Sequence, residues 1–127
     1  TDNDVTITDI KTGTLWAGDL LFIDRTPTID GDIHGFIDVL AQLISLENIN
    51  LVIPGHGPPT KNWQKAFKKV KNYFVILRDD IRNSIDEDQG LREAIETVAR
   101  SESKKWLLFD VQNARNINQV YPKLEWE

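Results

Sequence analysis

Residues 51–59 read LVIPGHGPP, and this stretch decides the fold. Leu51–Ile53 is typical of a buried strand, and it runs directly into a Pro/Gly cluster that holds one of the chain's two histidines. Before it, apolar residues recur at helical spacing between Phe36 and Leu46. A helix that leads into a strand, with a further strand pattern upstream, predicts an α/β fold in which helices cover a sheet.

Short strand patterns precede that helix. Val5–Thr8 alternates apolar and polar residues, and Leu15–Ala17 resumes the pattern after a turn in which Gly13 can adopt positive φ, so the two segments predict a hairpin. Leu20–Ile23 continues as an apolar strand. Residues 24–35, DRTPTIDGDIHG, are rich in turn formers and predict a long polar loop of the kind that carries function.

The second half of the chain is predicted to be helical. Thr60 is a candidate N-cap for a helix that runs to about Ile85, because a seam of apolar residues repeats at intervals of three and four. Further helices are expected at 91–100 and 113–127. Between them, four apolar residues are expected to pack: Trp106, Leu107, Leu108 and Phe109.

Five lysines accompany the long helix, namely Lys61, Lys65, Lys68, Lys69 and Lys71. They could form a binding stripe. They alternate with the apolar seam and the chain is acidic overall, so a solvated helix face is the favoured interpretation.

Composition limits the possible functions. The chain has 127 residues, 40% of them hydrophobic, which suits one domain with a single core. Its net charge of −5 argues against a nucleic-acid partner. The sequence has no apolar run long enough to span a membrane and no signal segment, which predicts a soluble chain. It contains neither cysteine nor methionine, and the missing methionine suggests a chain trimmed or cut from a longer one.

Asp19 interrupts the apolar stretch LWAGDLLF at residues 15–22, just after Gly18. A carboxylate buried there without a partner would cost several kcal/mol. His56 follows Gly55 in the same way at the end of its own strand, so two strands are expected to deliver an oxygen donor and a nitrogen donor to one site. Taken singly, Asp19 could instead cap a turn and His56 could bond to backbone.

At these residues the chain resembles the metallo-β-lactamase superfamily, in which an aspartate follows a glycine and a histidine lies in PGHG. The stretch AGDLLFIDRTPTIDGDIHGFIDVLAQL and the ending ARNINQVYPKLEWE are most similar to the periplasmic branch called quinoprotein relay system zinc metallohydrolases. The resemblance covers nearly the whole chain, and residues 1–127 are expected to form one unit of such a domain. It implies the C-terminal half of an αββα sandwich, with one small mixed sheet, helices on one face and a helical C-terminus.

The resemblance also implies a two-zinc site and metal-assisted hydrolysis of a small-molecule substrate. Asp19 would bridge the two ions and His56 would be the last metal histidine. The family's H-x-H-x-D-H motif is absent, and its remaining histidine would precede Thr1, since the element Thr-x-x-Asp begins this chain. With two ligands, we expect the chain alone to bind zinc weakly and to be inactive. A periplasmic location is implied by the same branch.

Two further residues are candidates for substrate binding. Arg25 could orient an anionic substrate or pair with Asp24, Asp30 or Asp32. His34 could contact substrate at the rim of the site, although an exposed loop histidine is the default interpretation.

Other functions stay open at this point. The chain could be a metal-free binding or assembly module that keeps the fold, or half of a glyoxalase II-like thioesterase. A half-sandwich should expose one apolar sheet face, which predicts a homodimer joined through the sheets, unless the helices wrap that face and keep the chain monomeric.

Overall fold

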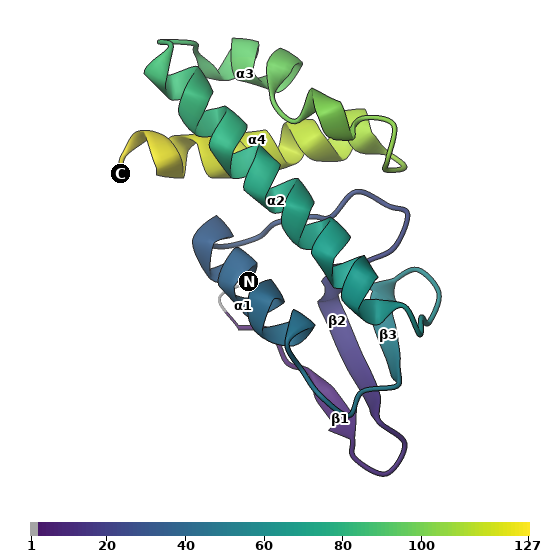
Figure 1. Ribbon diagram of the computed structural model, residues 1–127. Helices are drawn as coiled ribbons and strands as arrows, with labels where there is room; N and C mark the ends of the chain where they lie inside the picture. Colours follow the sequence, from purple (N-terminus) through teal and green to yellow (C-terminus); the bar gives the residue numbers. More distant parts are fainter. Residues whose placement is uncertain (1–2) are drawn as a thin grey trace.

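The computed structural model describes residues 3–127 and shows a mixed α/β chain (Figure 1). The predicted class, one small mixed sheet with a helical C-terminus, is confirmed. The elements are β1 (Ile7–Asp9), β2 (Thr14–Phe22), α1 (Ile33–Ile44), β3 (Leu51–His56), α2 (Trp63–Asp86), α3 (Leu91–Thr97), a 3₁₀ turn (Arg100–Glu102) and α4 (Phe109–Glu125).

The sheet has the order β1-β2-β3. β1 and β2 pair antiparallel through the predicted hairpin, whose Gly13 has a φ of +67° as expected. β2 and β3 pair in parallel, and α1 is the crossover between them. Parallel pairing points β2 and β3 in the same direction, so residues late in both strands share one end of the sheet.

The strand prediction was wrong in one respect that matters for the site. Asp19 was expected at the end of a strand, but Leu15–Ala17 and most of Leu20–Ile23 lie in the single strand β2, which ends at Phe22. The pairing with β3 shifts register on both sides of Gly18, so Gly18 and Asp19 form a bulge inside the strand rather than its end. β1 also begins two residues later than expected, at Ile7.

The starts of both long helices differ from the prediction. α1 begins at Ile33 because Asp32 caps it, with Gly35 N donating to Asp32 Oδ2 at 2.8 Å. α2 begins at Trp63, after Asn62, and Thr60 is not its cap. Thr60 exchanges two backbone hydrogen bonds with Val52, of 2.9 and 3.0 Å, and so lines the edge of β3.

The C-terminal helices also have different bounds. α3 ends at Thr97 and α4 begins at Phe109, four residues before the expected start. Left-handed backbone at Ala99 and Leu108 interrupts the helical path on either side of the 3₁₀ turn. Trp106 and Phe109 pack into the core as predicted, whereas Leu107 and Leu108 are exposed.

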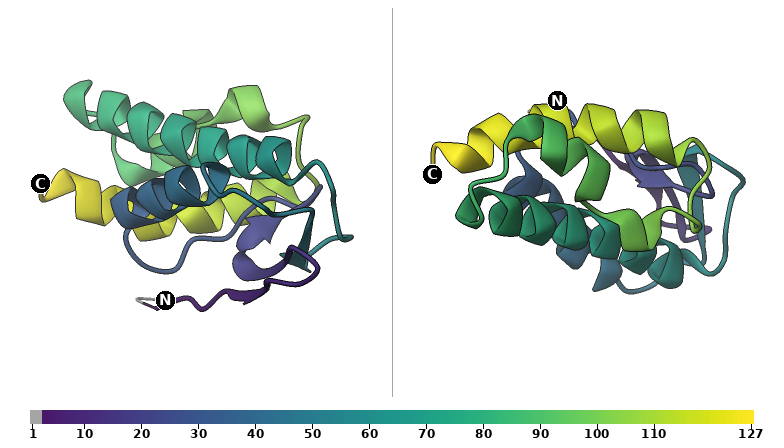
Figure 2. Two further views of the ribbon diagram at one scale, coloured as in Figure 1. Left: turned by 60° about the horizontal axis from the view of Figure 1, so that its bottom comes forward. Right: turned by 90° about the horizontal axis from the view of Figure 1, so that it is seen from above.

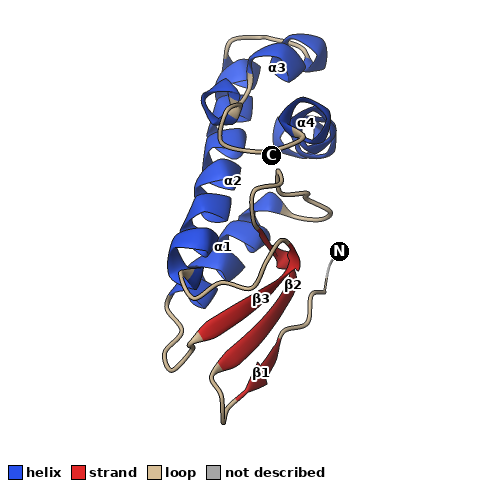
Figure 3. Cartoon of the chain, turned by 90° about the vertical axis from the view of Figure 1, so that its right-hand side faces the viewer, coloured by secondary structure: helices blue, strands red, loops and turns tan. Residues whose placement is uncertain are grey.

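The long helix α2 joins two ends of the molecule. Its first half packs beside α1 over one face of the sheet, and its second half packs against α4, which also contacts α3 (Figures 1 and 3). Seen from above, α3 bridges the α2 and α4 pair (Figure 2). The face of the sheet toward the helices is buried through Leu15, Ala17 and Val52. The helices thus lie on one face of the sheet, as predicted.

The predicted loop between β2 and α1 is anchored by α4 and the residues just before it. Thr26 donates from its hydroxyl to Leu107 O at 2.7 Å. The side chain of Asn116 accepts from Ile29 N at 3.1 Å and donates to Pro27 O at 2.7 Å. The loop is therefore held in one position by contacts that span most of the sequence.

No helix in the described part of the chain combines the length and the apolar character that crossing a membrane requires.

Candidate metal centre

The structure brings Asp19 and His56 together. The β2 bulge presents Asp19 and the last residue of β3 is His56, and Asp19 Oδ1 lies 3.4 Å from His56 Nε2. The side chain of Asp19 is 73% exposed and that of His56 is 38% exposed. Asp19 is therefore not the buried carboxylate that its apolar neighbours suggested, because the bulge turns it out of the sheet.

Gly55 makes this approach possible. A Cβ at this position would lie 2.7 Å from the carbonyl oxygen of Gly18 and 2.8 Å from Asp19 Oδ1, both far inside van der Waals contact. The bulge of β2 thus sits directly on the backbone of β3, and only a residue without a side chain fits beneath it.

The ring of His56 is oriented by two neighbours. Phe22 is its register partner on β2, and the two rings stack with centroids 4.8 Å apart and planes 12° from parallel. On the far side of the imidazole, Arg25 Nη1 lies 3.5 Å from His56 Nδ1. Nε2 is thereby directed toward Asp19.

A small cleft of about 140 Å³ opens in front of this pair. A second hollow of about 350 Å³ extends it along the start of α1 and shares Asp4, Asp30 and Phe36 with it. The cleft is lined by Asp4, Asp19, Phe22, Thr28, Asp30, Phe36 and His56.

The spacing of the two donors suits a shared zinc ion. Zinc bonds of roughly 2.0–2.2 Å in tetrahedral geometry place two ligands about 3.3–3.6 Å apart, and Asp19 Oδ1 and His56 Nε2 are separated by 3.4 Å. Among residues 3–127, no group of three or more histidine, aspartate or glutamate side chains is placed to hold a metal ion. The described residues therefore offer two ligands, fewer than a catalytic zinc normally has.

Arg25 opposes metal binding at the same histidine. A guanidinium can only donate, so His56 Nδ1 faces it as an acceptor, and the proton of the neutral ring then lies on Nε2. A metal at Nε2 requires the opposite tautomer, whose outer N–H usually finds a carbonyl or carboxylate. Zinc binding would therefore need Arg25 to move, and its buried Nε has no hydrogen-bond partner in the described residues.

The two residues predicted to bind substrate, Arg25 and His34, lie in different surroundings. Arg25 reaches His56, while Asp32 caps α1 and Asp30 accepts from Arg115 at 3.1 Å. His34 does not line the cleft. Its Nε2 lies 2.6 Å from Glu127 Oε1 at the end of the chain, which places it in a contact between α1 and the C-terminus.

Sequence patterns missed much of the cleft wall. Phe22 was assigned only to a strand, although its place opposite His56 follows once the strand register is known. Asp4 belongs to the Thr-x-x-Asp element of the resemblance and does line the cleft, whereas Thr1 lies outside the described residues. Thr28 and Phe36 come from the loop and from α1; Phe36 was expected only as an apolar residue of a helix, and no local pattern marks Thr28.

No protein-family model matches the chain, and no curated protein is significantly similar to it in sequence. The family resemblance consequently rests on the motifs and on the geometry just described.

Proposed function

We propose that this chain is the C-terminal half of a zinc-dependent hydrolase of the metallo-β-lactamase superfamily, located in the periplasm, with Asp19 and His56 as metal ligands. One observation carries the proposal. Two donors from different strands, each preceded by a glycine, converge at the ligand spacing of a tetrahedral zinc site.

The chain's own residues would have distinct tasks in such a site. Asp19 presents a carboxylate that can bridge two ions, and its exposure leaves the second oxygen available. Phe22 holds the plane of the His56 ring, and Gly55 lets the bulge approach. Zinc, when bound, supplies an activated water near neutral pH and a Lewis acid for the substrate. The cleft beside α1 gives room for a small molecule.

The open face of the sheet supports the same proposal. Ile7, Trp16 and Ile53 are consecutive register partners on β1, β2 and β3, so they form an apolar row across that face. Ile7 is 64% exposed and Trp16 is 41% exposed. In a sandwich this row would be the inner face, and in the 127-residue chain we propose that a second copy covers it, giving a homodimer.

Zinc titration calorimetry on the 127-residue chain tests the proposal. We expect weak binding, with a dissociation constant of tens of micromolar or more, because only two ligands hold the ion. Asp19→Ala and His56→Ala should abolish it. His34→Ala should leave it unchanged and is the matched control, since it removes the only other histidine.

Two results would contradict this assignment. Binding well below about 1 µM would mean that the ligand count is wrong. Binding that is equal in the wild type and in His56→Ala would place the ion elsewhere. In a longer protein that contains this chain, Asp19→Ala and His56→Ala should lose metal and hydrolysis together.

A metal-free binding module is the second candidate, and the contact of Arg25 with His56 favours it. Arg25→Gln separates the two candidates. The glutamine oxygen can accept a hydrogen bond from His56 Nδ1–H, and the substitution removes a positive charge beside the site. Zinc should therefore bind more tightly to this variant if Asp19 and His56 are its ligands. Unchanged, undetectable binding in Arg25→Gln would support the metal-free module.

A further inference from the structure

A second surface, separate from the cleft, lies between α1 and the first half of α2. Two adjoining hollows of about 300 and 360 Å³ share Lys68. Their walls carry Lys61, Lys65, Lys68 and Lys71, and the first hollow has an apolar floor of Ala41, Ile44 and Val75. We call this surface the lysine groove.

The charges of the lysine groove are not paired within residues 3–127. Its four lysines form no ion pair or hydrogen bond with residues 3–127, and the sequence contains no aspartate or glutamate between Glu47 and Asp79. Lys69, by contrast, points elsewhere, donating to Lys105 O at 3.2 Å and lying over the ring of Trp106. The positive charge is thus concentrated in a chain whose net charge is −5.

This placement is unfavourable for the helix that bears it. Lys65, Lys68 and Lys71 follow one another on α2 at spacings of three, where like charges on a helix repel. Lys61 precedes the N-terminus of α2 and Lys65 lies in its first turn, which has no acidic residue, although the helix dipole favours anions there. A solvated face would gain from interspersed acids, as in the second half of the same helix, where Arg78 pairs with Asp79.

We propose that the lysine groove is a docking site for an acidic segment of a partner protein. Carboxylates of that segment would meet Lys61, Lys65 and Lys68 at the rim, and an apolar side chain would lie over Ala41, Ile44 and Val75. The repulsion among these lysines, which is unfavourable for folding, would then serve binding.

The chemistry of the groove favours a protein segment over other polyanions. An extended nucleic acid or an anionic membrane would also meet the acidic remainder of the chain, which repels it. The apolar floor suits a segment that mixes carboxylates with aliphatic residues, and the groove supplies lysines, which are point charges, and no arginine fork for phosphate.

Fluorescence anisotropy with a labelled peptide EELLEELLEE tests the proposal. We expect saturable binding that weakens as salt is added. The double variant Lys65→Glu/Lys68→Glu should bind roughly tenfold more weakly, because two exposed attractions become repulsions. Its melting temperature should equal or exceed that of the wild type, since the repulsion within α2 is relieved, so lost binding cannot be ascribed to unfolding.

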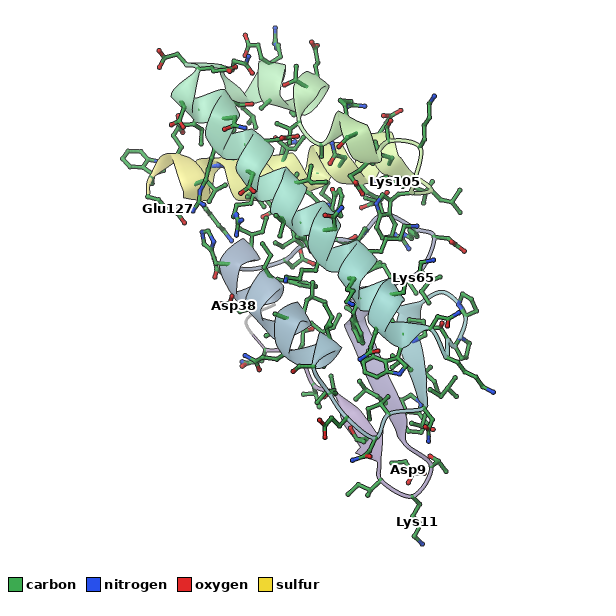
Figure 4. All side chains as sticks on the ribbon, in the orientation of Figure 1. Asp9, Lys11, Asp38, Lys65, Lys105 and Glu127 are labelled. Atoms are coloured by element: carbon green, nitrogen blue, oxygen red, sulfur yellow. The ribbon has the colours of Figure 1, made fainter. Side chains whose placement is uncertain are left out.

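The matched control is Lys11→Glu/Lys104→Glu, which changes the net charge equally at exposed lysines outside the groove. Figure 4 shows Lys11 at the tip of the β1–β2 turn, away from Lys65 on α2. This control should bind the peptide as the wild type does, within about twofold. An equal loss of peptide affinity in both double variants would mean that net charge alone determines binding, and it would overturn the proposed docking site.

Three probes decide the class of partner. The peptide QQLLQQLLQQ should not bind measurably. Tighter binding of oligothymidylate, or of vesicles containing phosphatidylserine, than of EELLEELLEE would overturn the assignment to a protein segment. No binding of EELLEELLEE at about millimolar concentration and low salt would overturn the docking site as a whole.

Discussion

The two ends of the molecule differ in how their polar and apolar groups are satisfied. At the helical end, Tyr73, Asn113 and Asn116 are completely buried and bonded to one another or to backbone. At the sheet end, Asp19 and His56 face an open cleft and an apolar row lies exposed. The buried polar groups of the helical end are satisfied by its own contacts, whereas the polar pair of the sheet end is left open to the cleft.

A buried hydrogen-bond network connects the helical end to the loop that borders the cleft. Tyr73 donates to Asn113 Oδ1 at 2.8 Å and accepts from Asn116 Nδ2 at 2.9 Å. Burial raises the pKa of Tyr73 far above its ordinary value, so the phenol stays protonated and can donate. Asn116 then extends the network to the loop that borders the cleft.

Breaking this network should have the largest effect. Asn116→Ala leaves Ile29 N and Pro27 O without their partner and removes the bond that the Tyr73 hydroxyl accepts, which should lower the free energy of unfolding by about 3–5 kcal/mol. Asn118→Ala on the same helix is the control. Its amide is exposed and donates only to Ala114 O, so its cost should stay within about 0.5 kcal/mol. Equal losses by urea denaturation in the two variants would refute the role of the network.

A substitution at Gly55 tests the close approach of the β2 bulge to β3. Gly55→Ala places a Cβ 2.7 Å from the Gly18 backbone, so the bulge must shift, at a cost of about 1–3 kcal/mol. Gly35→Ala is the control, because its Cβ meets only the Asp32 side chain at 3.3 Å within a helix that favours alanine. Thermal unfolding should show a loss for the first variant and a neutral or positive change for the second. A tolerated Gly55→Ala would mean that the bulge does not rest on β3.

The sequence predicted the helical seam of α2 well, because burial on one face repeats locally. Six of its seven predicted residues are buried and the last, Ile85, is partly buried; the six are Trp63, Phe67, Val70, Phe74, Leu77 and Ile81. The start of α2 was missed because Thr60 bonds to Val52, and that pairing depends on a fold that no local pattern encodes. The bulge at Gly18 was missed for the same reason, since two short strands and one bulged strand have the same hydrophobic pattern.

The sequence predicted that Asp19 and His56 come together, and it missed most of the residues around them. Asp19 and His56 each follow a glycine, and such a short local pattern can be recognised in the sequence alone. Phe22, Thr28 and Phe36 reach the cleft only through strand register and the anchoring of the loop by α4. Arg25 was identified as a site residue, but its contact with His56 was not foreseen.

The exposed row at the sheet end should control association more than stability. Light scattering should give the wild-type chain about twice its 14.6 kDa mass at micromolar concentration, and Trp16→Thr should give a monomer. Threonine suits a strand, so unfolding should change by less than about 1 kcal/mol. Trp126→Thr is the control, because this tryptophan is also exposed but lies after α4, and that variant should stay dimeric. A wild-type monomer whose mass does not change on tenfold concentration would exclude the dimer.

The smallest effect on stability is expected at an exposed contact between the start of α1 and the C-terminus. His34 Nε2 and Arg82 Nη2 both contact the carboxylate of Glu127, at 2.6 and 3.1 Å, and these bonds hold its pKa below the ordinary value of 4.5. A lowered carboxylate pKa stabilises the fold above the ordinary value, and this contribution disappears as the pH falls through the lowered one. Glu127→Gln should therefore reduce the melting temperature slightly at neutral pH and not at all in strong acid. The control is Glu125→Gln, an exposed glutamate two residues earlier, which should show no such pH dependence. A titration midpoint of the Glu127 carboxyl carbon at or above 4.5 by NMR would show that the contact with His34 does not persist in solution.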